Sequence, residues 1–412
     1  MATIRPLRAQ GMASSIARGS IRPTRYMTSS KGWLASRVQV RYMSGPYGYT
    51  QAKSLVFSEY GEPKDVLKLH THSISPSLPS SSVLLRSLAA PINPADVNTI
   101  QGTYGAKPPF DRLLGTPEPS IVPGNEGAFE VVSSSASSAG LYPGDWVIPK
   151  KTLFGTWRTH VLAPANAVIK VDKTGLTPAQ VATVSVNPCS AYRMLRDYVG
   201  PHTLREGDWF IQNGANSGVG RAAIQLGHLW GYRSINVVRA RPTPAEDAAL
   251  KQELTDLGAT HVVTEPEFYA REFKSRLAEW TRGGREGVRL GLNCVGGNSA
   301  QGVARALGRR ASVVTYGGMA RAPVALPTGL LIFRDIRFVG FWLSRWADGD
   351  TAAKKRTVAE ILGLIREGKF KDVPIVEVPW TWETGVEDLR EAVQGTLEGY
   401  RKGKGVFTFR DT

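Results

Sequence analysis

The sequence predicts an α/β protein in which a β-rich part precedes a doubly wound parallel sheet. Two observations carry this prediction. Between about residues 54 and 164, short apolar runs are bounded by Gly, Pro and Ser, which is typical of β-strands. After about residue 177, strand-like and helix-like segments alternate, as they do in parallel sheets covered by helices. The 412 residues suffice for two or three domains.

The first 43 residues have the composition of a mitochondrial transit peptide. They carry eight basic residues, and no acidic residue precedes Glu59. An Arg-rich, Ser-rich, acid-free segment is drawn across a membrane by the inside-negative potential. Arg41–Ser44 resembles a matrix-protease cleavage site, and Arg25–Thr28 is an earlier candidate. The sequence therefore predicts import into the mitochondrial matrix and removal of residues 1–43; the alternative is a basic arm that binds nucleic acid.

Charge and cysteine content exclude several classes of protein. Half of the net charge of +16 lies in residues 1–43, and the remaining +8 favours anionic partners without indicating nucleic acid. No uncharged apolar stretch approaches 18 residues, so we expect no membrane insertion. The two cysteines, Cys189 and Cys294, cannot build a disulfide framework or a four-thiolate zinc site.

Individual elements follow from local patterns. In the β-rich part the predicted strands are Leu55–Phe57, Val66–Leu69, Ser82–Leu85, Ala128–Val132 and Trp146–Ile148. In the second part they are Trp209–Gln212, Ile235–Val238, His261–Thr264, Leu290–Val295 and Ala311–Tyr316. Helices are predicted from the glycine-rich turn to Leu229, over Pro244–Leu257 up to Gly258, and over 267–280.

A glycine-rich turn over Gly214–Gly220 follows one predicted strand and opens one predicted helix. In this context glycines let the backbone turn tightly and approach a pyrophosphate. The helix start adds free N–H groups and the positive end of the helix dipole. The turn therefore predicts a dinucleotide site; the alternative is a tight turn without a ligand.

Two arginines indicate which dinucleotide binds. The next strand of such a unit usually ends in an acid that holds the ribose of NAD, but here Val238 is followed by Arg239 and Arg241. Guanidinium groups suit the 2′-phosphate of NADPH, and each charge-assisted pair contributes about 1.5–3 kcal/mol. We therefore predict NADPH; the alternative is two solvated surface arginines.

A zinc-binding pattern that this chain partly resembles lacks its metal ligands here. Medium-chain dehydrogenases that use zinc have a Gly-His-Glu run near the end of the β-rich domain, and this chain has Gly124-Asn125-Glu126. No cysteine precedes Cys189, and an amide is a poor zinc ligand. Alcohol oxidation would lack its Lewis acid, whereas reduction of a conjugated double bond needs no metal.

Four stretches together resemble the mitochondrial 2-enoyl thioester reductases, which belong to the zinc-free medium-chain dehydrogenase/reductase superfamily. They are Pro91–Gly105, Val186–Leu195, the glycine-rich turn, and Thr315–Met319 with Phe341–Leu343. The resemblance extends from about residue 50 to 409. It implies a GroES-like catalytic domain over 44–186 and 345–412, a Rossmann NADPH-binding domain over 187–344, and an active site between them.

The resemblance also assigns residues. It implies that Tyr104 donates a proton to the substrate. It implies cofactor contacts for Asn187, Asn216, Ser217, Gly218, Val219, Arg239, Arg241, Tyr316, Gly317, Gly318, Met319, Phe341, Trp342, Leu343 and Lys404. Lys402 lies close enough to Lys404 to be an alternative, and Ala240 stands where the family has an acid.

The implied activity is NADPH-dependent reduction of a trans-2-enoyl thioester in mitochondrial fatty acid synthesis. The substrate would be an enoyl-CoA or an enoyl-acyl carrier protein, with hydride to Cβ and a proton to Cα. A homodimer joined along the edge strand Ile336–Phe341 is expected, and no nucleic-acid partner. The nearest alternative is an NADPH quinone oxidoreductase; a more distant one is a non-catalytic NADPH-binding scaffold or RNA-binding protein.

Overall fold

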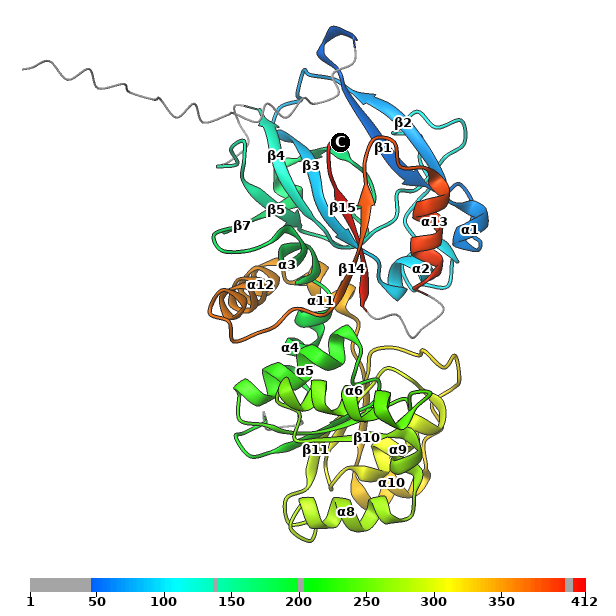
Figure 1. The fold of residues 1–412 in the computed structure, drawn as a ribbon, viewed down its shortest axis with the longest axis vertical. Helices are drawn as coiled ribbons and strands as arrows, with labels where there is room; N and C mark the ends of the chain where they lie inside the picture. The colour runs from blue at the N-terminus through cyan, green and yellow to red at the C-terminus, as the bar shows by residue number, and fades with distance from the viewer. Residues whose placement is uncertain (1–45, 136–139, 199–203, 397–402) are drawn as a thin grey trace, which may run out of the picture. The chain divides into compact units, whose positions relative to one another are not determined.

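The computed structural model describes residues 46–135, 140–198, 204–396 and 403–412 (Figure 1). The predicted transit peptide, its cleavage sites and Lys402 lie outside these residues. The described chain forms a two-stranded, a six-stranded and a seven-stranded sheet. No helix in these ranges has the length and apolar character needed to span a membrane.

The seven-stranded sheet contains the β-rich part and the end of the chain. Its order is β14-β15-β3-β4-β5-β7, with β6 also paired to β3. The strands are β3 (Ser82–Pro91), β4 (Ala128–Ser134), β5 (Trp146–Pro149), β6 (His160–Pro164), β7 (Val168–Val171), β14 (Ile375–Trp380) and β15 (Lys404–Phe409). Because β15 runs antiparallel to β3, pairing Val406 with Pro91, the C-terminal segment completes this sheet.

Smaller elements flank that sheet. β1 (Thr50–Val56) and β2 (Lys68–Ile74) form the two-stranded sheet, and the helices of this part are α1 (Pro63–Val66), α2 (Pro94–Ile100) and α13 (Val386–Gln394). Short turns precede β1 at Pro46–Gly48 and join β6 to β7 at Ala165–Ala167. The prediction of a strand starting at Val66 was wrong. Pro63 occupies the first turn of α1, where its missing N–H costs nothing, so Val66 ends a helix and the strand begins at Lys68.

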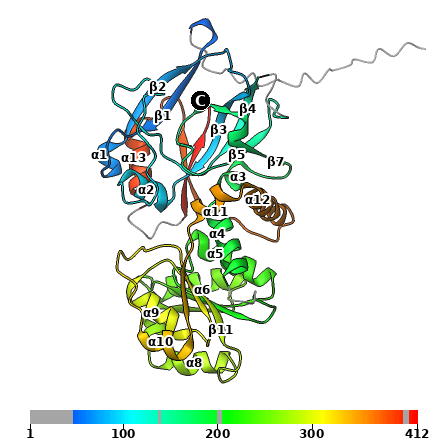
Figure 2. The same cartoon turned by 180° about the vertical axis from the view of Figure 1, so that it is seen from behind.

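The six-stranded sheet is parallel, in the order β10-β9-β8-β11-β12-β13. Its strands are β8 (Trp209–Gln212), β9 (Arg233–Val238), β10 (His261–Thr264), β11 (Val288–Asn293), β12 (Ser312–Thr315) and β13 (Arg337–Gly340). Phe210 packs with α5 (Gly218–Leu229) on one face, and Ile211 packs with α9 (Gly297–Ala306) on the other. The prediction of a doubly wound sheet is confirmed; α6 (Pro244–Asp256) and α10 (Thr328–Arg334) are further helices of this part of the chain (Figure 2).

The helix predicted over 267–280 is two helices, α7 (Glu265–Tyr269) and α8 (Glu272–Trp280). On one continuous helix Phe268 and Phe273 would point about 140° apart, because successive residues turn by about 100°. The break at Ala270 lets both rings enter the same core cluster, where their centroids are 4.8 Å apart.

Four helices connect the two large sheets: α3 (Pro178–Thr183), α4 (Asn187–Asp197), α11 (Leu343–Gly349) and α12 (Thr351–Arg366). One buried cluster contains Ile148 of β5, Met194 of α4, Phe210 of β8 and Ile361 of α12. Residues of both large sheets therefore belong to the same buried cluster. The domain boundaries at 186/187 and 344/345 stay a prediction.

Candidate functional site

The glycine-rich turn follows the end of β8 at Gln212 and runs into the first residues of α5, which starts at Gly218. Gly214 has a φ of 59°, and a Cβ on it would lie 2.5 Å from the Cys294 Sγ, so only glycine fits there. The Ser217 side chain accepts a hydrogen bond from the Gly220 N–H and caps α5. A Cβ on Gly220 would lie 2.4 Å from the Ala215 carbonyl oxygen, so the backbone of the turn packs tightly against the start of α5. A tight turn of this kind at a helix N-terminus is the form of a phosphate-binding loop.

Five of the predicted cofactor residues lie together at this turn: Asn187, Asn216, Ser217, Gly218 and Val219. A Cβ on Gly218 would lie 2.5 Å from the Asn187 Nδ2, so the amide of the first residue of α4 lies directly against the turn. The Arg221 Nε donates to the Asn216 carbonyl oxygen at 3.1 Å and holds the turn closed. These residues fit the pyrophosphate of a dinucleotide.

Arg239 and Arg241 follow β9, the neighbour of β8. The Ala215 N–H donates to the Val237 carbonyl at 3.1 Å, which ties the glycine-rich turn to the end of β9. The Arg241 N–H donates to Asp247 Oδ1 at 2.7 Å and fixes the backbone after the strand. Both arginines therefore follow the strand end beside the turn, which suits the 2′-phosphate of NADPH.

The predicted residues of the third stretch extend from neighbouring strand ends. Tyr316 follows β12 and its N–H donates to the Asn293 carbonyl at 2.9 Å, while the Met319 N–H donates to the Cys294 carbonyl at 2.9 Å. Gly317 and Gly318 lie between them, and Phe341 follows β13. Burial raises the pKa of Tyr316 well above its usual value, so its hydroxyl stays protonated. These residues share the carboxyl edge of the sheet with the glycine-rich turn.

Tyr104 follows α2 and reaches the segment that starts α11. The Trp342 Nε1–H donates to the Tyr104 hydroxyl oxygen at 2.9 Å, and the Ser344 Oγ lies 3.0 Å from the same oxygen. The rings of Tyr104 and Trp342 meet edge to face, with centroids 6.0 Å apart. Trp342 of the predicted cofactor set therefore contacts the predicted proton donor, and Leu343 lies between Trp342 and Ser344 in the chain. Ser344 was missed from the sequence, although it stands two residues after Trp342.

Lys404 lies in a buried polar network. Its ammonium donates to the Asn93 Oδ1 and lies 3.5 Å from the Glu126 Oε1, with the Lys404 side chain only 8% exposed. The other Glu126 oxygen accepts from the Val186 N–H at 2.9 Å. Burial raises the pKa of Glu126. The network thus ties β15 to the start of α4, directly before Asn187.

The donors at this network do not fit a zinc ion. Asn125 uses both ends of its amide: Nδ2 donates to Asp96 Oδ1 at 2.7 Å, and Oδ1 accepts from the Leu153 N–H at 2.9 Å. The Lys404 ammonium brings a positive charge to the same set. Across the described ranges, no three His, Cys, Asp or Glu side chains come together as a metal site.

The buried Asp96 predicts a specific pH dependence of stability. Burial raises its pKa from 3.8 to about 6. A carboxyl with a higher pKa in the folded chain stabilises that chain fully below its unfolded pKa, and this stabilisation is lost as pH rises through the folded pKa. Between about pH 4 and pH 7, wild type should therefore lose up to about 3 kcal/mol of unfolding free energy relative to Asp96→Asn in urea titrations. If the unfolding free energies of wild type and Asp96→Asn changed with pH in parallel, this prediction would be contradicted.

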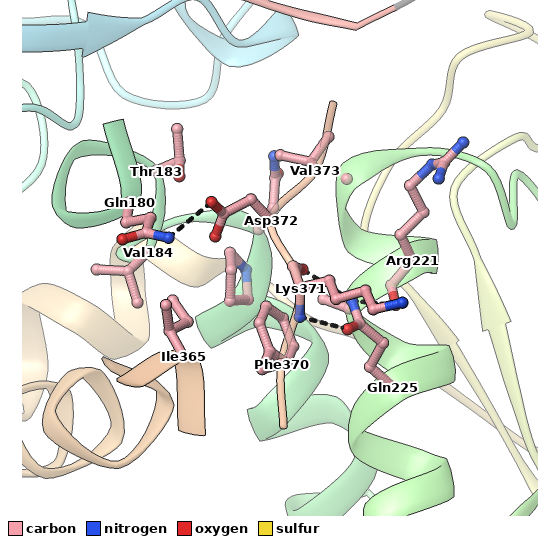
Figure 3. Close-up of a pocket in the computed structure, with 14 residues that line it drawn as sticks. Gln180, Thr183, Val184, Arg221, Gln225, Ile365, Phe370, Lys371, Asp372 and Val373 are labelled. Atoms are coloured by element: carbon pink, nitrogen blue, oxygen red, sulfur yellow. Dashed lines mark hydrogen bonds between the residues drawn. The ribbon is translucent and has the colours of Figure 1, made fainter. Parts of the chain in front are cut away.

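A pocket opens beside the glycine-rich turn (Figure 3). Asn187 and Gly218 line it together with residues of α3, α12 and the segment 370–373. Gln180 Nε2 donates to the Asp372 carboxylate at 2.8 Å, and the Lys371 N–H donates to Gln225 Oε1 at 2.7 Å. These bonds hold the segment that leads to β14 against α3 and α5, next to two predicted cofactor residues.

Comparison with known proteins gives consistent matches. Residues 79–173 match the family described as "Alcohol dehydrogenase GroES-like domain", and residues 218–358 match "Zinc-binding dehydrogenase". The mitochondrial enoyl-[acyl-carrier-protein] reductase of Yarrowia lipolytica is 50% identical over 323 residues, 78% of this chain and 82% of that protein. The Homo sapiens protein of the same description is 39% identical over 359 residues, 87% of this chain and 89% of its own.

Solved structures agree with these sequence relatives. The Etr1p/NADP/crotonyl-CoA complex has 38% identity and a TM-score of 0.82, covering 87% of this chain and 99% of that one. An Etr1p/Etr2p heterodimer from Candida tropicalis has 38% identity and a TM-score of 0.81 over the same shares of both chains. A quinone reductase from Bacillus thuringiensis, at 24% identity and a TM-score of 0.72 over 87% of this chain and 99% of its own, shares the fold.

Proposed function

Because this chain belongs to the mitochondrial enoyl-[acyl-carrier-protein] reductases of the medium-chain dehydrogenase/reductase superfamily, we propose that it moves hydride to Cβ of a trans-2-enoyl thioester while Tyr104 delivers a proton to Cα. It is an NADPH-dependent enoyl reductase of mitochondrial fatty acid synthesis. The observation that carries the proposed role of Tyr104 is its hydroxyl, which lies 2.9 Å from the Trp342 Nε1 in the segment after β13.

Different residues of the chain are proposed to bind different parts of NADPH. NADPH, when bound, supplies the hydride. The glycine-rich turn Gly214–Gly220 and Asn187 receive its pyrophosphate, and Arg239 and Arg241 receive its 2′-phosphate. The remaining proposed contacts are Tyr316, Gly317, Gly318, Met319, Phe341, Trp342, Leu343 and Lys404. Lys404 also anchors the buried network in which Glu126 accepts from the Val186 N–H, directly before α4.

Proton delivery rests on the hydroxyl of Tyr104. A phenol carries one proton that it can donate and oxygen lone pairs that accept hydrogen bonds. As the Cα–H bond forms, the Tyr104 O–H bond breaks and negative charge appears on its oxygen. The Trp342 N–H already points at that oxygen and stabilises the charge. The phenolate regains a proton from solvent before the next turnover.

The substrate is proposed to be an enoyl group carried on coenzyme A or on an acyl carrier protein. Both carriers are anionic, and the net charge of +8 on residues 44–412 favours their approach. A direct test compares NADPH oxidation with a crotonyl thioester and with a quinone. We expect rapid oxidation with the thioester and little with the quinone; the reverse order would favour the quinone oxidoreductase alternative.

We further propose a homodimer joined along β13. This strand is the edge of the six-stranded sheet, and next to it α10 exposes Ile332 by 66% and Phe333 by 72%. Unpaired edge strands and exposed apolar side chains favour burial against a second chain. Phe333→Glu should shift the protein from dimer to monomer in light scattering, whereas Leu113→Glu, at a site that is 87% exposed elsewhere, should leave it dimeric. A dimer that persists in Phe333→Glu would contradict this interface.

A further inference from the structure

The hydroxyl of Tyr104 has a second neighbour besides Trp342. The Ser344 Oγ lies 3.0 Å from the Tyr104 oxygen, and either atom can be the donor of that hydrogen bond. Trp342, in contrast, has an indole N–H that can only donate. One lone pair of the Tyr104 oxygen is therefore held by Trp342, and the direction of the other hydrogen bond depends on where the phenol proton is.

We propose that Ser344 is a positioning residue for the proton donor Tyr104, a role that rests on the function proposed above. While the phenol holds its proton and awaits the substrate, the Tyr104 O–H donates a hydrogen bond to the Ser344 Oγ, which keeps the Tyr104 ring in one orientation. When that proton passes to Cα of the substrate, the Ser344 O–H turns and donates to the phenolate. Ser344 keeps its own proton throughout, because the phenolate is reprotonated by solvent. Only a group that both donates and accepts serves both states.

The local structure holds Ser344 in the place that this role needs. It is the second residue of α11, which starts at Leu343, and it is 6% exposed. The Trp346 N–H donates to the Trp342 carbonyl at 3.3 Å, which closes the first turn of the helix around Ser344. On the other side, a Cβ on Gly105 would lie 3.6 Å from the Trp342 ring, so the chain after Tyr104 runs close to the indole. Ser344 and Trp342 therefore approach one phenol oxygen from a single fixed segment.

A hydroxyl in this position contributes mainly when charge is present. Hydrogen bonds to charged groups are stronger than neutral ones, and a donor aimed at an oxygen that becomes negative acts chiefly on the transition state. Loss of the Ser344 hydroxyl should therefore lower kcat by about 10- to 100-fold while leaving NADPH affinity unchanged. If Ser344 had only a structural role, its loss would lower the stability of the protein, and kcat would not fall selectively while NADPH affinity stayed unchanged.

The test is a double-mutant cycle on the full chain with a crotonyl thioester. Ser344→Ala should lower kcat, Ser344→Thr should restore most of it, and Ser344→Ala should have no further effect on the residual rate of Tyr104→Phe. Ser87→Ala removes another buried hydroxyl, which donates to the Arg158 carbonyl oxygen, and should retain kcat, so it controls for loss of folding.

The outcomes separate this inference from the function on which it rests. Wild-type kcat in Ser344→Ala, or an equal further loss in the Tyr104→Phe background, would overturn the role of Ser344 while leaving Tyr104 as the proton donor. Wild-type kcat in Tyr104→Phe itself would instead overturn the proposed function of Tyr104.

Discussion

Replacement of Tyr104 by Phe is expected to lower kcat for a crotonyl thioester by about 100- to 10 000-fold, the usual contribution of a positioned general acid. The substitution removes one oxygen atom and keeps the ring against Trp342, whose centroid lies 6.0 Å away. The Kd for NADPH, measured by its fluorescence, should not change, because the lost group acts on the substrate carbon.

A second tyrosine provides the control for this experiment. The Tyr192 hydroxyl, on α4, donates to the Glu360 carboxylate of α12 at 2.7 Å, so Tyr192→Phe removes the same atom from a residue that belongs to neither the proposed cofactor contacts nor the proton donor. It should retain wild-type kcat. If Tyr104→Phe also retained it, another group would have to deliver the proton.

Replacement of both Arg239 and Arg241 by Ala is expected to weaken NADPH binding roughly 100-fold or more. Each charge-assisted pair contributes about 1.5–3 kcal/mol, and neighbouring pairs do not add fully. NADH lacks the 2′-phosphate, so its Kd should change little and the preference between the two nucleotides should nearly vanish.

The exposed Arg285, whose Nε donates to the Arg282 carbonyl oxygen at 3.0 Å, supplies a control that removes one positive charge outside the proposed site. Arg285→Ala should keep the preference for NADPH. A double variant at Arg239 and Arg241 that still preferred NADPH as strongly as wild type would show that the 2′-phosphate is bound elsewhere.

The parts of the fold that the sequence predicted depend on local patterns. Local patterns sufficed to predict the strands β8, β9 and β10 and the glycine-rich turn, because apolar runs, glycines and helix caps act over a few residues. The break at Ala270 could not, because it depends on two phenylalanine rings entering one core.

The site residues that belong to sequence motifs could be predicted. The contacts between segments that are distant along the chain could not. Tyr104 and Trp342 each belong to a motif, but no local pattern indicates that they touch, since 238 residues separate them. The proposed role of Ser344 depends on its contact with Tyr104, so no local pattern could indicate it. The network of Asn93, Glu126 and Lys404 likewise joins three segments that are remote along the chain. Such contacts follow from sheet order, above all from the return of β15 to β3.

The most direct measurement of the central claim uses NADPH that carries deuterium at the transferred position of the nicotinamide, with a crotonyl thioester in ordinary water. The product should be the saturated thioester with deuterium at Cβ and a solvent-derived proton at Cα. Deuterium at Cα, or oxidation of NADPH without saturation of the thioester, would contradict the account.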